Sequence, residues 1–117
     1  MGLGRLEIYQ MSLKLSASVW SIYSQLPKPL QFSIGDQVLR SIDSIGANIA
    51  EGYGRYHYKD STKFYYNARG SLWESKHWFY LLFKRNLIAK EVFDENIALL
   101  DALGKKLNGF IRTLSKK

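Results

Sequence analysis

Basic and aromatic side chains alternate along the middle of this chain, from Arg55 to Arg85. Lysine and arginine bind phosphate groups without reading a base sequence, and exposed tyrosine rings can stack on unpaired bases. The pattern therefore predicts a surface that binds RNA or DNA with little sequence preference. We assign to that surface Arg55, Lys59, Lys63, Arg69, Lys76, Lys84 and Arg85. The alternative is a solvated helix face whose tyrosines belong to the core or to a subunit contact.

The positive charge of the chain is concentrated in the same segment. The formal net charge is +7 over 117 residues. Residues 1–54 have a net charge of 0, residues 55–90 have +6 and residues 91–117 have +1. A positive field confined to one segment is typical of a surface that meets a polyanion. A basic protein can also use its charge for solubility alone.

Nothing in the sequence indicates enzymatic chemistry. The two histidines, His57 and His77, are twenty residues apart, and the chain has no cysteine to complete a metal site with them. No histidine lies near a candidate nucleophile in a recognisable motif. The segment Gly52 to Gly54 is not a phosphate loop, because no strand precedes it and no Lys-Ser or Lys-Thr follows. We therefore predict no catalytic residues, no metal and no cofactor.

The composition predicts one folded domain, residues 1–117, in a reducing compartment. Hydrophobic residues make up 46% of the chain and there are only two prolines, which is typical of a globular protein. The absence of cysteine excludes a disulfide scaffold and suits the cytoplasm. The longest apolar run, Trp78 to Phe83, is far shorter than the roughly 20 residues that span a bilayer. The N-terminal residues do not form a signal peptide, so we expect no membrane contact.

Four helices must position these residues. Apolar residues recur every three or four positions over about residues 6–25, 33–54, 60–86 and 90–115. The prolines in the segment Leu26 to Leu30 separate the first helix from the second, and Asp60 is the expected N-cap of the third. No segment alternates with a period of two, so the fold class is all-α. Short turns make neighbouring helices antiparallel, which predicts an up-and-down four-helix bundle.

Small and polar residues predict how the second and third helices pack together. The segments Ser44 to Arg55 and Ala68 to Glu74 are rich in small residues, which let two helices approach closely. Asn48 would need hydrogen-bond partners if buried, and we expect it to fix the register of the second helix against the third. The alternative is that Asn48 contacts a ligand directly. The residues with this structural role are Asp43, Asn48, Glu51, Gly52, Gly54, Gly70 and Glu74.

A turn near residues 56 and 57 would place Arg69 opposite Asp43 and Ser44. We predict an ion pair between Arg69 and Asp43 that ties the hairpin. The alternative is that Arg69 contacts an external anion.

The first helix has two apolar stripes, which is more apolar surface than one core can bury. One stripe consists of Leu6, Tyr9, Leu13, Ala17 and Trp20, and the other of Ile8, Leu15, Val19, Ile22 and Leu26. The third helix also carries aromatic residues outside its core stripe. A monomer would expose an apolar patch above the few hundred Å² that monomers tolerate, so we predict a homo-oligomer.

Three strings in order give the chain a family resemblance. They are Ser44-Ile-Gly-Ala-Asn-Ile-Ala-Glu-Gly-Tyr-Gly-Arg55, Ala68-Arg-Gly-Ser-Leu-Trp-Glu74 and Leu107-Asn-Gly-Phe-Ile111. Together they resemble the four-helix-bundle proteins encoded in intervening sequences of bacterial large-subunit (23S) ribosomal RNA genes, from about Leu6 to Leu114. The chain departs from the usual pattern of that family at Ser61, Trp73, His77, Trp78 and Tyr80.

The resemblance implies an antiparallel four-helix bundle that assembles into a basic, ring-like homopentamer. A relative of that family is the accessory variability protein of a retroelement, which binds nucleic acid and a reverse transcriptase. Our leading hypothesis is a non-enzymatic, oligomeric bundle that binds RNA or DNA. The alternative is a structural or adaptor ring that recruits a partner protein such as a reverse transcriptase.

Overall fold

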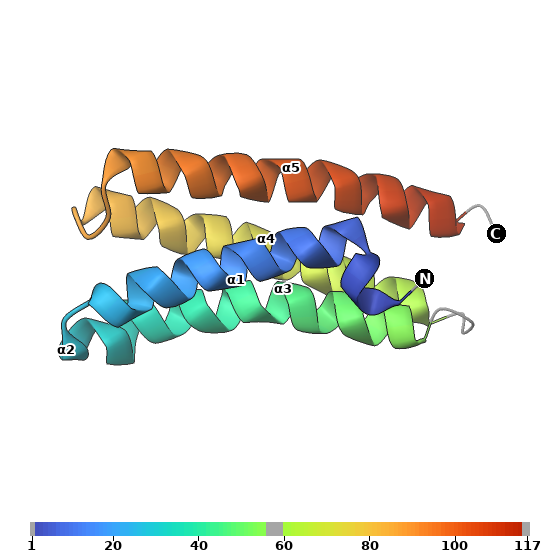
Figure 1. Cartoon of the computed structure of the whole chain (residues 1–117), viewed down its shortest axis with the longest axis horizontal. Helices are drawn as coiled ribbons and strands as arrows, with labels where there is room; N and C mark the ends of the chain where they lie inside the picture. Colours follow the sequence, from blue (N-terminus) through green and yellow to red (C-terminus); the bar gives the residue numbers. More distant parts are fainter. Residues whose placement is uncertain (1, 56–59, 116–117) are drawn as a thin grey trace.

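In the computed structural model, which describes residues 2–55 and 60–115, four long helices lie side by side with alternating directions (Figure 1). A short 3₁₀ turn, η1, precedes them. The elements are η1 (Leu3–Arg5), α1 (Glu7–Gln25), α2 (Lys28–Leu30), the π-helical turn η2 (Gln31–Gly35), α3 (Asp36–Gly54), α4 (Ser61–Lys84) and α5 (Lys90–Ser115). The predicted all-α, up-and-down four-helix bundle is confirmed. The bundle measures 46 × 23 × 21 Å.

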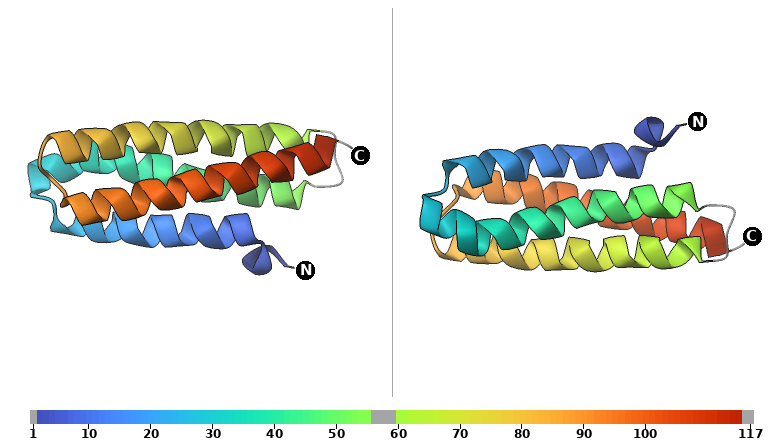
Figure 2. Two further views of the ribbon diagram at one scale, coloured as in Figure 1. Left: turned by 90° about the horizontal axis from the view of Figure 1, so that it is seen from above. Right: turned by 90° about the horizontal axis from the view of Figure 1, so that it is seen from below.

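Each long helix has two neighbours in the bundle. α1 packs on α3 and α5, and α4 packs on the same two helices. The two views of Figure 2 show α4 beside α5 on one side and α1 beside α3 on the other. The described N-terminal residues lie at the same end of the bundle as the C-terminal end of α5 (Figure 1).

The second long helix begins earlier than the sequence predicts. We expected a start near Ser33, but helical conformation begins at Lys28 and continues through η2 into α3. Pro29 does not interrupt it, because a residue in the first helical turn has no intrahelical partner for its N–H. The wide π turn brings the carbonyl oxygen of Leu30 within 2.9 Å of the place where a Cβ on Gly35 would lie. Glycine is therefore the residue that fits there without distortion.

The core takes one apolar stripe from each long helix. On α1 it is the stripe from Ile8 to Leu26 that is buried, with Leu15 and Val19 fully inaccessible to solvent. Of the other predicted stripe, Leu6 is also buried in the core, whereas Leu13 is 50% exposed and Trp20 is 58% exposed. The core residues of the later helices include Val38, Ile42, Ile45, Ile49, Tyr65, Ala68, Leu72, Phe79, Leu82, Leu100, Leu103, Leu107 and Ile111.

Serine pairs set the register between α3 and α4. The hydroxyl of Ser75 donates to Ser41 at 3.0 Å, and that of Ser71 donates to Ser44 at 2.9 Å. Ser41 and Ser75 are buried, so the bond between them satisfies hydroxyls that water cannot reach. Contrary to the prediction, the side chain of Asn48 makes no hydrogen bond to α4 among the described residues. Its amide donates to the carbonyl and hydroxyl oxygens of Ser44, one turn earlier on the same helix. The side chain of Asn48 is only half buried.

The two ends of α4 are defined by different groups. Asp60 occupies the predicted N-cap position, but its carboxylate makes no capping hydrogen bond and binds Arg55 and Lys63 instead. At the other end Asn86 has φ of 58°, in the left-handed region that asparagine tolerates. The N–H groups of Leu87 and Asn86 bond to the carbonyls of Leu82 and Phe83. This pair of bonds is a Schellman motif, and it ends the helix.

Candidate nucleic-acid interface

Three exposed aromatic rings form a line along the outer side of α4, at positions seven residues apart: Tyr66, Trp73 and Tyr80. Seven residues are close to two turns of a helix, so the rings point in nearly the same direction. The guanidinium of Arg69 lies 4.7 Å from the centroid of the Tyr66 ring, and Nζ of Lys76 lies 4.3 Å from that of Trp73. Within the described residues, the predicted alternation of cations and rings is therefore a feature of the surface.

Lys76 is not the free cation that the sequence predicts. Its Nζ lies 2.6 Å from Oδ1 of Asp101 on α5, and its side chain is only 16% exposed. The carboxylate offsets most of the positive potential of Lys76. This lysine therefore joins α4 to α5 and is a weaker candidate for phosphate binding. Local sequence patterns could not predict this pair, because its members are 25 residues apart on different helices.

Arg69 binds α5 and not α3. Its Nη1 donates to Oδ1 of Asn108 at 3.0 Å, which leaves other guanidinium N–H groups for further contacts. Asp43 instead accepts a hydrogen bond from the hydroxyl of Ser16 on α1. The predicted ion pair between Arg69 and Asp43 is therefore wrong.

The error in that pair was one of register. In the structure Ser44 faces Ser71, whereas the assumed turn placed Ser44 opposite Arg69. A shift of two residues along a helix turns a side chain by about 200°, to the opposite side. The side of α4 that holds Arg69 consequently faces α5.

Arg55 and Lys63 lie where α3 leads toward α4, and both pair with acids. Nε of Arg55 is 2.9 Å from Glu51 and its Nη1 is 3.4 Å from Asp60, while Nζ of Lys63 is 3.6 Å from Asp60. The hydrogen bond that Arg55 donates to Glu51 raises the pKa of the Arg55 guanidinium, which stays charged. The formal charges of these four described residues cancel. Lys59, the other predicted contact in this region, lies outside the described residues.

Other cations on the side formed by α4 and α5 have no carboxylate partner among the described residues. Lys84 and Arg85, at the C-terminal end of α4, are exposed and have no ion-pair partner in the part of the chain that the structure describes. The same holds for Lys105 on α5. With Arg69, which binds a neutral amide, these residues are the strongest phosphate-binding candidates.

A groove of about 290 Å³ lies between α4 and α5. Arg69, Leu72, Trp73 and Lys76 line it from α4, and Leu100, Asp101, Gly104, Lys105 and Asn108 line it from α5. The indole of Trp73 is 62% exposed. The groove therefore combines a flat ring with two cations that have no carboxylate partner among the described residues.

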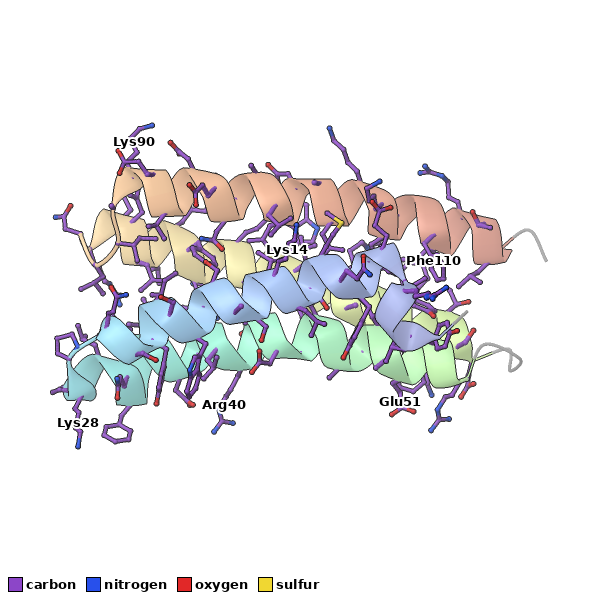
Figure 3. The ribbon with its side chains drawn as sticks, viewed as in Figure 1. Lys14, Lys28, Arg40, Glu51, Lys90 and Phe110 are labelled. Atoms are coloured by element: carbon purple, nitrogen blue, oxygen red, sulfur yellow. The ribbon has the colours of Figure 1, made fainter. Side chains whose placement is uncertain are left out.

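The α1–α3 side of the bundle has a different character. α3 carries three acidic residues and one basic residue, whereas α4 carries four basic residues and one acidic residue. A second groove, of about 210 Å³, runs between α1 and α3 and is lined by small residues such as Gly46, Ala47 and Ala50. Lys28 and Arg40 extend from this part of the bundle away from α5, which carries Lys90 on its far side (Figure 3). The Arg40 charge is offset by Asp36 at 2.8 Å.

The glycines of the predicted structural motif have different surroundings. A Cβ on Gly52 would lie 2.8 Å from the ring of Tyr65, so this glycine lets α3 approach α4 closely. In the part of the chain that the structure describes, no side chain or other helix lies within 4 Å of the corresponding position on Gly54 or Gly70. Glu74, the last member of the motif, accepts a hydrogen bond from Nε1 of Trp78 at 3.0 Å.

Comparison with known proteins identifies the family. The model of the 23S rRNA-intervening sequence protein family matches residues 4–109. The chain belongs to this family. No protein with a curated description matches the chain.

A solved structure has a closely similar fold. It is the crystal structure of a protein of unknown function from the S23 ribosomal protein family of Bacteroides thetaiotaomicron VPI-5482. The TM-score is 0.82 at 25% sequence identity, over 90% of this chain and 95% of the other. Among the described residues, no helix is both long enough and apolar enough to cross a membrane.

The three strings that carry the family resemblance lie together in the fold. Ser44 of the first string accepts a hydrogen bond from Ser71 of the second, and Arg69 of the second donates to Asn108 of the third. α3, α4 and α5 are thus joined in turn by residues of these strings. The strings therefore have a structural role in this family member.

Sequence reasoning missed the contribution of α5 to the basic side. Asp101, Lys105 and Asn108 line the groove, but none was among the predicted site residues. Lys105 and Asn108 lie one helical turn or less apart, on one face of α5. That spacing, together with the place of Asn108 in the third string, could have indicated that α5 contributes to the basic side.

Proposed function

We propose that this chain is a non-enzymatic, oligomeric nucleic-acid-binding protein of the 23S rRNA-intervening sequence family. The observation that supports this proposal best is that cations with no carboxylate partner among the described residues, such as Arg69, lie beside exposed rings on the side formed by α4 and α5. Phosphates attract cations in any base sequence, so such a surface would bind RNA or DNA with little specificity. The lack of cysteine suits work in the reducing cytoplasm.

The proposed phosphate contacts differ in strength. Arg69, Lys84, Arg85 and Lys105 would contribute most, because their charges are not offset by a carboxylate among the described residues. Arg55, Lys63 and Lys76 would contribute less, because each already binds an acid. Lys84 and Arg85 are adjacent in sequence, so one phosphate backbone could contact both.

Self-association would use the α1–α3 side. Leu13 and Trp20 are exposed on α1, and the neighbouring groove is lined by small residues that permit close approach. A second copy of the chain is the occupant that we propose for this face. An oligomer would repeat the basic surface around the assembly, and several weak contacts would then act together. The family resemblance favours a pentameric ring.

The second candidate function is that of an adaptor that recruits a partner protein such as a reverse transcriptase. The observation that favours it is the exposure of large apolar residues outside the basic side, above all Phe32, which is 79% exposed. In that case the positive charge would serve the protein contact or solubility.

A binding titration distinguishes nucleic-acid binding from the adaptor function. The parent protein is titrated with single-stranded and duplex RNA of about 20 nucleotides at several salt concentrations, while light scattering gives its mass. Nucleic-acid binding predicts an affinity that falls steeply as salt rises, since bound counterions are released. Absence of binding even at about 50 mM salt would contradict the proposal and favour the adaptor. One species of 13.5 kDa at micromolar concentration would contradict self-association.

A further inference from the structure

The groove between α4 and α5 has a floor that is apolar and closed. Leu72 and Leu100 are buried, at 2% and 0% exposed, so nothing penetrates beneath them. Gly104 contributes no side chain to the wall on α5. A Cβ there would lie 3.8 Å from the methyl groups of Leu72, which is an ordinary contact distance. Alanine would therefore fit, and it would favour the helix more than glycine does. The effect of glycine here is to leave the groove open.

One wall of the groove is an aromatic ring and its rim is basic. Trp73 is 62% exposed even though Lys76 lies beside its ring, so much of the indole surface is accessible. Arg69 and Lys105 line the same groove, and neither is paired with a carboxylate among the described residues. Lys76 offsets part of the negative charge of Asp101, which reduces the repulsion between Asp101 and a bound anion.

We propose that this groove is a subsite for one unpaired nucleotide. Its base packs against the indole of Trp73, and its phosphate binds Arg69 and Lys105. This inference rests on the proposed nucleic-acid binding and narrows it to unpaired strands, because a base inside a duplex is stacked between its neighbours and cannot lie against a ring. The volume of about 290 Å³ is at the lower end of ligand sites, which suits one base and excludes a helical stack.

Two similarly exposed tryptophans allow a matched test. Trp20, 58% exposed on α1, stacks on Tyr23 and has no cation among its described ring contacts. The variants Trp73→Leu and Trp20→Leu are titrated in a calorimeter with octauridylate, octathymidylate, a duplex of eight base pairs and inorganic polyphosphate. A third variant, Gly104→Leu, fills the groove and keeps Trp73. Circular dichroism shows whether each variant remains helical.

Base stacking on Trp73 predicts a selective loss. Trp73→Leu and Gly104→Leu should each lower the affinity for both unpaired oligomers by at least about fivefold. Their affinities for the duplex and for polyphosphate should stay within about twofold of the parent, because those ligands bind by charge alone. Trp20 lies on the face proposed for self-association, so any change that Trp20→Leu causes should be equal for all four ligands, with no selective loss for the unpaired oligomers.

Failure of the subsite and failure of the proposed function give different results. If the parent binds the unpaired oligomers and both groove variants bind them equally well, the subsite is wrong and general nucleic-acid binding stands. An equal loss for polyphosphate would likewise contradict stacking, because polyphosphate has no bases. If the parent binds no nucleic acid, the proposed function fails and the subsite fails with it.

Discussion

The side of α4 that faces α3 is lined by small and hydroxyl-bearing residues, whereas the side toward solvent and α5 carries aromatic rings and cations. On the inner side Ala68, Ser71 and Ser75 pack against α3 with hydroxyls paired across the helices. On the outer side Trp73 and Arg69 border a groove. Close packing requires small groups with satisfied hydrogen bonds, while binding requires groups that protrude. One helix therefore divides structural and proposed binding roles between its two sides.

The largest expected difference between the two sides is in stability. Phe79 of α4 is fully buried, so Phe79→Ala should lower the free energy of unfolding by about 3 to 5 kcal/mol. Trp73→Ala removes a larger side chain from the outer side and should cost less than about 1 kcal/mol. Denaturant unfolding monitored by circular dichroism measures both. Similar losses for the two variants would mean that the outer side is also packed in solution.

Tyr65, on the inner side, should make stability sensitive to alkali. Burial, with a smaller effect of Tyr53, raises its pKa to about 12 from an ordinary value of 10.0. The folded state thus favours the neutral phenol. Its contribution is complete below about pH 10 and is lost as the pH rises toward 12, a loss of roughly 2 to 3 kcal/mol. Unfolding measured between pH 9 and 12 should show this fall, and Tyr65→Phe should reduce it. An unchanged pH profile in that variant would assign the effect to other groups.

Two glycines should respond to alanine with opposite signs. Gly52→Ala places a methyl group 2.8 Å from the ring of Tyr65 and should destabilise the protein by about 1 to 3 kcal/mol. Gly70→Ala lies on the open side and should stabilise α4 by roughly 0.5 to 1 kcal/mol through helix propensity. Thermal unfolding gives both shifts. Destabilisation by Gly70→Ala would indicate that a second subunit approaches the outer side of α4 closely.

The smallest effect concerns the contact between α4 and α5. A double-mutant cycle of Arg69→Ala and Asn108→Ala should give a coupling of about 0.5 to 1.5 kcal/mol, as expected for one hydrogen bond. The cycle of Arg69→Ala with Asp43→Ala should be additive within about 0.5 kcal/mol, because these residues bind different helices. Coupling only in the second cycle would restore the ion pair that the structure contradicts.

Sequence periodicity predicted the fold because core stripes repeat every three or four residues. It could not decide which of the two stripes of α1 is buried, since both have helical spacing. It also could not fix the register between α3 and α4, which depends on the geometry of the connection. That uncertainty of two residues reversed the side on which Arg69 lies. The start of the second long helix was misplaced because prolines at 27 and 29 were both taken as breaks.

Only the part of the candidate site that lies on α4 could be predicted from the sequence. Local composition identified the cations and rings of α4, because they lie close together in sequence. The partners of those cations come from α5, about 25 to 39 residues later, and only the folded chain brings them together. Lys76 was therefore overvalued as a phosphate contact, and Lys105 was overlooked.

Charge reversal on the two sides of the bundle tests the central claim most directly. Lys84→Glu with Lys105→Glu changes the α4–α5 side, and Lys14→Glu with Lys28→Glu changes α1 and α2. Each double variant lowers the formal net charge from +7 to +3, so the overall charge is matched. The affinity for single-stranded RNA is measured from about 50 to 200 mM salt. We expect the first variant to lose affinity and to lower the slope of log K against log salt by about 1 to 2, while the second keeps the slope of the parent. Equal losses in the two variants would show that RNA responds to net charge alone, and would contradict a binding surface on α4 and α5.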